Sequence, residues 1–131
     1  TVRENLCLGK NIEDEQLMMY LKEAGLNEWV EKLENGLNTV VGERGLRLSV
    51  GQKQRLNIIR GILLNKDIYV LDEPTSNLDK ETEKLIINLI QKYLKDKTVI
   101  IVTHRDEIKS ICSRHYEFKD NVMKEYKLVK I

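Results

Sequence analysis

Long apolar runs and an excess of charge of one sign are both missing from the sequence. The longest run of apolar residues, 17–21, is far shorter than the roughly 20 residues that cross a bilayer. The 22 basic and 21 acidic residues leave a net charge of +1, whereas a protein that works mainly by binding nucleic-acid phosphates usually has a basic excess. We therefore expect no membrane span within these residues and no nucleic acid among the partners.

Cysteine and proline are also scarce. The two cysteines, Cys7 and Cys112, have neither the spacing of a metal site nor that of a disulfide framework, which favours a reduced, cytosolic compartment. No segment resembles a secretion signal. The single proline, Pro74, lies in the most motif-like stretch, and the first residue is Thr1 rather than an initiator methionine. We therefore expect the sequence to be a piece of a longer polypeptide.

The residues that are present suffice for a folded domain rich in helix. A chain of 131 residues is within the usual size of one domain and can bury a core without disulfides. Apolar residues follow helical spacing over about 11–24 and, more briefly, over 29–33, whereas the glycine-rich residues 37–48 are predicted as a loop. Residues 49–52, Ser-Val-Gly-Gln, have the pattern of a capping box and predict a helix that ends near residue 64.

Two short β-prone apolar runs, 68–71 and 98–103, are typical of strands buried on both faces of a parallel sheet. Between them, Asp79 is placed to cap a helix over 80–94. A right-handed crossover through that helix would make the two strands parallel neighbours, so we predict an α/β fold. The remaining predicted elements are a short helix over 107–112 and a hairpin over 115–128 that turns at Asp120 and Asn121.

The carboxyl ends of the two predicted strands carry Asp72, Glu73 and His104, at the edge where ligands gather in parallel sheets. Two carboxylates beside an apolar strand are costly to place unless they are used. One can hold a hydrated Mg²⁺ through its waters, and the other can orient or deprotonate an attacking water. The imidazole can donate to a phosphate oxygen. These residues alone leave open a solvated turn with a capping acid and a structural histidine.

The predicted helix start at Ser49 also has two interpretations. Unpaired N–H groups and the positive end of the helix dipole make such a start an anion site. Gly51 would let the backbone come close to a phosphate. An ordinary capped helix explains the same residues equally well.

In combination, these motifs resemble the ATP-binding cassette family, in the family's order and with family-like gaps. Residues 48–52 resemble its signature motif, usually LSGGQ. Residues 68–75 resemble its Walker B motif with the catalytic acid that follows it. Residues 76–79 resemble the D-loop, usually SALD, and residues 103–104 resemble the switch-histidine motif. The resemblance covers essentially the whole chain.

The flanking residues resemble the exporter branch of that family. Residues 39–45 are similar to its TEVGERG stretch, and residues 1–6 to the segment after its glutamine loop. Val40 replaces the glutamate of that stretch, which weakens any inference about contacts with membrane-domain helices. Val50 replaces the first glycine of the signature, and we expect a modest effect.

The P-loop pattern GxxxxGK[ST] does not occur, and the glutamine loop and the adenine-stacking aromatic are missing too. The chain therefore resembles the second half of a nucleotide-binding domain, a partial P-loop NTPase fold. Residues 1–64 would form its helical signature subdomain. Residues 65–131 would form the Walker B and switch-histidine part of the ATPase core, with the hairpin at its end.

The resemblance implies an ATP hydrolase that works as a head-to-tail dimer of such domains, with ATP and Mg²⁺ as cofactors. Asp72 would serve the metal, and Glu73 and His104 would be catalytic. The residues toward the nucleotide on the partner domain would be Ser49, Gly51, Gln52 and, at the junction between the two sites, Asp79. The parent protein would export a substrate together with a transmembrane domain, at the cytoplasmic face of the membrane. The isolated chain would be soluble and inactive.

Two other functions share these motifs. A DNA-repair or chromosome-maintenance ATPase would have long coiled-coil heptads ahead of the signature, and residues 1–48 contain none. A regulatory cassette that binds nucleotide without turnover would not need Glu73 and His104, and their presence argues against it. The transported substrate is not encoded here, because its recognition would lie in membrane segments.

Overall fold

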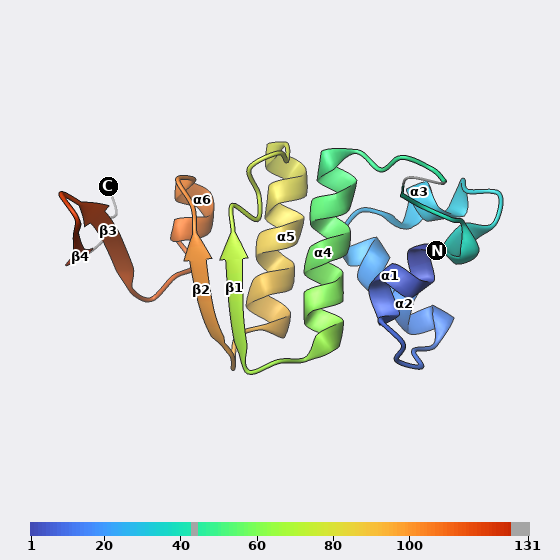
Figure 1. Cartoon of the computed structure of the whole chain (residues 1–131), viewed down its shortest axis with the longest axis horizontal. Helices are drawn as coiled ribbons and strands as arrows, with labels where there is room; N and C mark the ends of the chain where they lie inside the picture. The colour runs from blue at the N-terminus through green and yellow to red at the C-terminus, as the bar shows by residue number, and fades with distance from the viewer. Residues whose placement is uncertain (43–44, 127–131) are drawn as a thin grey trace.

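The computed structural model describes residues 1–42 and 45–126. Its elements follow one another across an elongated molecule, with a group of short helices at one end and a β-hairpin at the other (Figure 1). Helices α4 (Val50–Leu64) and α5 (Lys80–Tyr93) lie between the short helices and a two-stranded sheet. No helix of the described segments is long and apolar enough to cross a membrane.

The N-terminal part consists of short helices, two of which pack on α4. Helix α2 (Asp14–Glu23) lies within the predicted helical stretch, and α3 (Asn27–Glu31) begins slightly earlier than its apolar residues indicate. A further helix, α1 (Val2–Cys7), was not predicted; a capping box between Thr1 and Glu4 begins it. The fully buried side chains of the whole core are mainly aliphatic and include Leu6, Leu17, Leu21, Leu26, Ile59, Ile86, Leu89 and Ile108.

The glycine-rich stretch before α4 is irregular, as predicted, apart from a short 3₁₀ turn over Gly36–Asn38 and one β-bridge between Val41 and Leu46. Two residues of the exporter-like stretch 39–45, Glu43 and Arg44, lie outside the described residues.

The sheet contains strands β1 (Ile68–Asp72) and β2 (Thr98–Val102), which pair in parallel with Ile68 opposite Thr98 and Asp72 opposite Val102. Helix α5 connects them, so the predicted strand–helix–strand unit is confirmed. The parallel register brings the carboxyl ends of both strands to one edge of the sheet.

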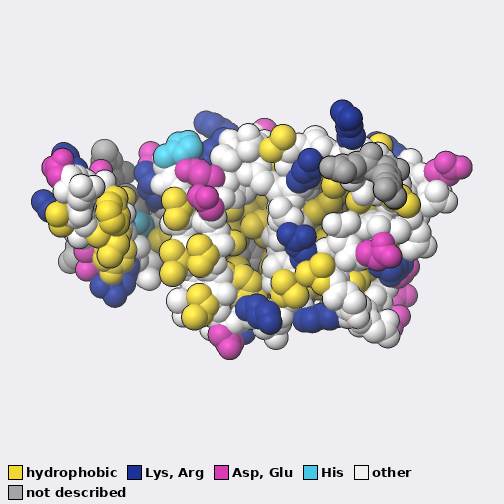
Figure 2. Space-filling view, in the orientation of Figure 1, with side chains coloured by type: hydrophobic (Ala, Val, Ile, Leu, Met, Phe, Trp, Pro, Cys, Tyr) yellow, Lys and Arg dark blue, Asp and Glu magenta, His cyan; other side chains and the backbone are white. Residues whose placement is uncertain are grey.

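The prediction that both strands are buried on both faces is wrong for the described residues. Alternate side chains of the strands, those of Ile68, Val70, Ile100 and Val102, are between 52% and 68% exposed. They form an apolar patch on the open face over β1 and β2 (Figure 2). Tyr69, which points to the opposite face, is buried. Helices of the described segments therefore cover only one face, although the composition of the strands suits burial on both.

The last elements are the short helix α6 (Asp106–Lys109) and a hairpin of β3 (His115–Lys119) and β4 (Val122–Tyr126). Helix α6 begins one residue before the predicted helix and ends three residues before its predicted end. The hairpin turns at Asp120 and Asn121 as predicted, and both residues have positive φ angles, 50° and 60°, which suits a tight two-residue turn. Residues 127–128 of the predicted hairpin lie outside the described residues.

Candidate functional site

Glu73 and His104 meet at the carboxyl edge of the sheet. Asp72 is the last residue of β1, and the backbone N–H of Glu73 still donates to Val102 O, at 2.9 Å, so pairing continues one step past the strand. His104 follows β2 after one intervening residue, and its Nδ1 lies 2.8 Å from Glu73 Oε1. The structure therefore brings together these two predicted catalytic residues, with the exposed Asp72 beside them.

The backbone at Glu73 adopts a left-handed conformation with φ of 46°. Such a conformation is unfavourable for a residue with a side chain and persists only where its surroundings enforce it. The second carboxylate oxygen, Oε2, is buried and has no hydrogen-bond partner among the described residues. A buried acceptor without a donor is costly, so this oxygen is available to a water or ligand that can donate to it.

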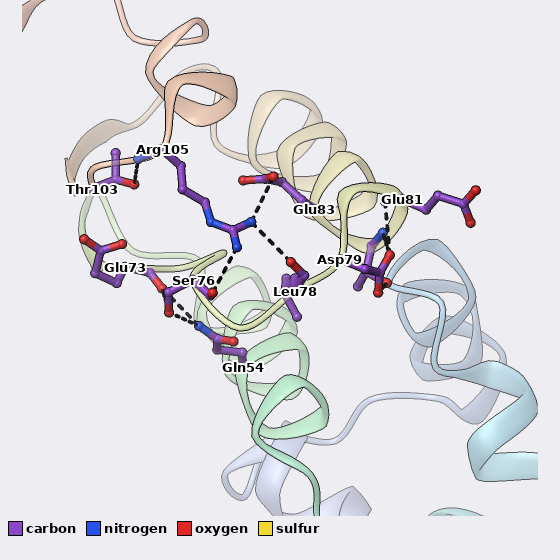
Figure 3. Close-up of polar contacts among 10 residues, drawn as sticks. Gln54, Glu73, Ser76, Leu78, Asp79, Glu81, Glu83, Thr103 and Arg105 are labelled. Atoms are coloured by element: carbon purple, nitrogen blue, oxygen red, sulfur yellow. Dashed lines mark hydrogen bonds and ion pairs between the residues drawn. The ribbon is translucent and has the colours of Figure 1, made fainter.

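The turn after Glu73 is held from α4 (Figure 3). The side-chain amide of Gln54 donates to Glu73 O at 3.0 Å and to Ser76 Oγ at 3.1 Å. Ser76 in turn donates its backbone N–H and its hydroxyl to Glu73 O, at 3.2 and 3.1 Å. One carbonyl thus accepts from three donors, which fixes the peptide that carries the Glu73 side chain.

Arg105 holds the same turn from the opposite side, and its guanidinium lies between the turn and α5 (Figure 3). Its Nη2 donates to Ser76 O at 3.0 Å, and its Nη1 donates to Leu78 O at 3.2 Å. The same Nη1 also lies 3.0 Å from Glu83 Oε2, whose side chain is only 2% exposed. An arginine fork can satisfy two carbonyls and a carboxylate together because its donors are fixed in one plane.

Gln54, Glu83 and Arg105 were not predicted from the sequence. The burial of Glu83 could have been predicted, because this residue lies three residues before the buried Ile86 on the apolar face of α5. A carboxylate at such a position needs a cationic partner. No sequence pattern indicates the roles of Gln54 and Arg105, since their contacts depend on how distant elements pack.

Asp79 caps α5, as predicted. Its Oδ1 accepts from the backbone N–H groups of Glu81 and Thr82 at 3.1 and 2.9 Å, and its Oδ2 accepts from the Thr82 hydroxyl at 2.8 Å. The backbone and side-chain donors of Thr82, followed by the backbone of Glu81, lower the pKa of Asp79. The structure therefore gives this carboxylate a local role at the start of α5, and its predicted place between two sites stays a prediction.

The start of α4 is exposed and is held by local contacts. The Ser49 hydroxyl accepts from Gln52 N at 3.1 Å, and Gln52 Oε1 accepts from Ser49 N at 2.9 Å, so the predicted capping box is confirmed. None of the hydrogen bonds of the described residues joins Ser49 or Gln52 to the Glu73–His104 pair. Gly51 faces the turn: a Cβ there would lie 3.3 Å from Leu78 Cδ2.

The sequence is similar to those of several known proteins. The sequence pattern of the family described as "ABC transporter" matches residues 1–76. An ATP-dependent lipid A-core flippase from Pseudoalteromonas translucida is 44% identical over 107 residues, which is 80% of this chain and 18% of that protein. Multidrug resistance protein pgp-1 from Caenorhabditis elegans is 43% identical over 106 residues, 80% of this chain and 8% of that protein.

The glutathione/L-cysteine transport system ATP-binding/permease protein CydC from Haemophilus influenzae is 44% identical over 107 residues. The match covers 80% of this chain and 19% of that protein. The chain therefore spans less than a fifth of the length of these curated relatives.

Proposed function

The chain belongs to the ABC transporter family, and on that premise we propose that it is the second half of a nucleotide-binding domain that hydrolyses ATP to drive export. Residues 1–64 would be its helical subdomain, and residues 65–131 would belong to its ATPase core. The observation that carries this proposal is the 2.8 Å contact between His104 Nδ1 and Glu73 Oε1 at the carboxyl edge of two parallel strands. The printed names of the relatives, "ATP-dependent" and "ATP-binding/permease", support it.

Glu73 is suited to accept the proton of an attacking water. His104 holds one carboxylate oxygen, and the other is buried without a partner among the described residues. A base positioned in this way contributes roughly 10²–10⁴ in rate. The His104 side chain is 76% exposed. As an imidazolium it can donate from both ring nitrogens, through Nδ1 to Glu73 Oε1 and through Nε2 to a phosphate oxygen.

The residues at this edge fit a nucleotide with Mg²⁺. The exposed carboxylate of Asp72 is an oxygen ligand of the kind that holds a hydrated Mg²⁺ through its waters. The unpaired Glu73 Oε2 is an acceptor without a donor within the described residues. Mg²⁺, when bound, offsets the negative charge of the phosphates. Asp72 would orient the metal's water ligands, and the neighbouring Glu73 would be left for proton transfer.

The start of α4 is proposed to face the nucleotide held by a second such domain. Ser49 and Val50 are exposed, and the first N–H groups of a helix attract anions. Ser49, Gly51 and Gln52 would complete the partner's site, with Asp79 at the junction. Val50 is 60% exposed, so its side chain is accommodated, whereas Gly51 is the position where a neighbouring turn comes close.

The whole protein is proposed to act at the cytoplasmic face of a membrane, together with a transmembrane domain. The relatives named as flippase, multidrug resistance protein and permease support a membrane-associated parent.

The test replaces Glu73 by Gln in the full-length transporter that contains this chain. Because the amide keeps the size of the side chain and removes its basicity, we expect ATP turnover to fall by about 10²–10⁴, while ATP binding stays within a few-fold. Steady-state phosphate release and nucleotide titration measure the two quantities.

Glu125→Gln in the exposed hairpin, where Glu125 pairs with Arg114, is the matched control and should leave turnover unchanged. Near-normal turnover of the Glu73→Gln variant would remove Glu73 from the catalytic role.

A further inference from the structure

Arg105 is attached to the same loop as His104 but binds the turn that follows Glu73. The loop is closed by a hydrogen bond from Arg105 N to Thr103 Oγ1 at 3.1 Å, so His104 lies between two residues that are tied together. The Arg105 side chain then reaches across to Ser76 O and Leu78 O. The loop that carries the imidazole and the turn that follows the carboxylate are therefore joined by one side chain.

The contacts of Arg105 continue without interruption to the peptide of Glu73. Ser76, whose carbonyl accepts from Arg105, donates its N–H and its hydroxyl to Glu73 O. Gln54 donates to the same carbonyl and to the Ser76 hydroxyl. Because Glu73 has an unfavourable φ of 46°, its conformation depends on contacts of this kind.

Glu83 explains how the guanidinium is held in place. Its side chain is 2% exposed, and one of its oxygens lies 3.0 Å from Arg105 Nη1. A buried carboxylate strongly favours a cation beside it, so the arginine is anchored on α5 and presents its remaining donors to the turn. A lysine could keep the ion pair, but a single ammonium lacks the planar fork that serves two carbonyls at once.

We propose that Arg105 is a positioning residue that holds the 76–78 turn through the carbonyls of Ser76 and Leu78 and thereby keeps the Glu73 carboxylate against His104. Glu83 anchors Arg105, and Gln54 supports the turn from α4. The effect on hydrolysis rests on the proposed function, whereas the effect on the turn does not.

The first arm of the test is Arg105→Lys in the full-length transporter. The lysine retains the charge next to the buried Glu83, so the protein folds, and only the fork to the two carbonyls is lost. We expect kcat for ATP hydrolysis to fall on the order of tenfold to a hundredfold, since misplacing a reacting group by about 1 Å has effects of this size. The KM for ATP should change less than about twofold, because the donors of the Arg105 guanidinium are engaged by Ser76 O, Leu78 O and Glu83.

The matched control is Arg114→Lys in the hairpin. Arg114 is likewise held by more than one contact, but both go to Glu125 in the hairpin: Nε donates to Oε1 at 2.9 Å and Nη2 donates to Oε2 at 3.3 Å. This substitution should leave kcat and KM unchanged. Equal losses in both variants, or a wild-type kcat for Arg105→Lys, would overturn the proposal.

The second arm does not depend on activity. In the same full-length protein, the amides of Ser76 and Leu78, which donate to Glu73 O and Thr75 O, should exchange hydrogen about tenfold faster after Arg105→Lys. The α5 amide of Ile90 should be unaffected. Unchanged exchange at the turn would overturn the proposal even if turnover falls.

The two arms separate the proposals. If the wild-type protein does not hydrolyse ATP, the proposed function fails, and the exchange measurement still decides whether Arg105 holds the turn. If the wild type hydrolyses ATP and Arg105→Lys changes neither kcat nor exchange, the positioning role alone fails.

Discussion

The start of α4 and the Glu73–His104 pair are both candidate functional groups, but they are built in different ways. The capping box at Ser49 closes between residues three apart in the sequence. The Glu73–His104 contact joins residues 31 apart, and Gln54 and Arg105 reach the same turn over 19 to 29 residues. A local motif forms without contacts from the rest of the chain, whereas the Glu73–His104 pair forms only when β1, β2, α4 and α5 pack correctly.

The start of α4 and the Glu73–His104 pair also differ in the interactions for which they are suited. The start of α4 is exposed, and its own side chains accept from the N–H groups of Ser49 and Gln52. In the Glu73–His104 pair, Glu73 Oε2 is buried and has no hydrogen-bond partner among the described residues. The first therefore suits contact with another surface, and the second suits a chemical step within this chain.

Arg105→Ala should have the largest effect on stability, because it removes the long-range contacts that hold the turn beside the Glu73–His104 pair. The change leaves Glu83 as a buried carboxylate without its cation. We expect a loss of about 3 kcal/mol, at the low end for breaking a buried pair, because 26% of the Arg105 side chain is exposed. Native-state hydrogen exchange of the most protected α5 amides measures it. A loss no larger than that of an exposed arginine such as Arg114 would show that Glu83 finds another partner.

Ser49→Ala should have a smaller effect that stays confined to the start of α4, because the capping box is local. The hydroxyl that accepts from Gln52 N is removed, and losing a helix cap costs about 1 kcal/mol. Exchange should accelerate in the first turn of α4 only. Faster exchange at the Ser76 or Leu78 amides in this variant would mean that the start of α4 and the turn are coupled after all.

Asp79→Asn should have the smallest effect, and one that depends on pH. Because the folded structure lowers the pKa of Asp79, the charged carboxylate stabilises the fold above the ordinary aspartate pKa, about 3.9. That contribution is lost as pH falls through the lower folded value. The wild type should therefore have a higher thermal midpoint than the variant at neutral pH, and the difference should vanish in strong acid. A difference that persists unchanged in acid would show that the charge is not responsible.

Much of the fold could be predicted because its signals are local. The Ser49 box, the Asp79 cap and the turn at Asp120 each depend on a few neighbouring residues. The start of helix α1 also has a local pattern, Thr1 followed three residues later by Glu4, which is typical of a capping box. The prediction that the strands are buried on both faces was wrong because an apolar composition shows only that a strand can be buried. The exposure of Val70 and Ile100 depends on which elements pack against them.

The element order, the helix caps and the residues at the strand ends follow from the amino-acid sequence alone, because each is set by local hydrogen bonding and periodicity. Three further features arise only when the elements pack together: Glu73 Oε1 lies against His104, Glu73 takes a left-handed backbone, and Arg105 joins the loop to the turn. These depend on the parallel pairing of β1 with β2 and on α4 and α5 packing beside them. Such contacts join groups that are distant in the chain, so they form only after the core has folded.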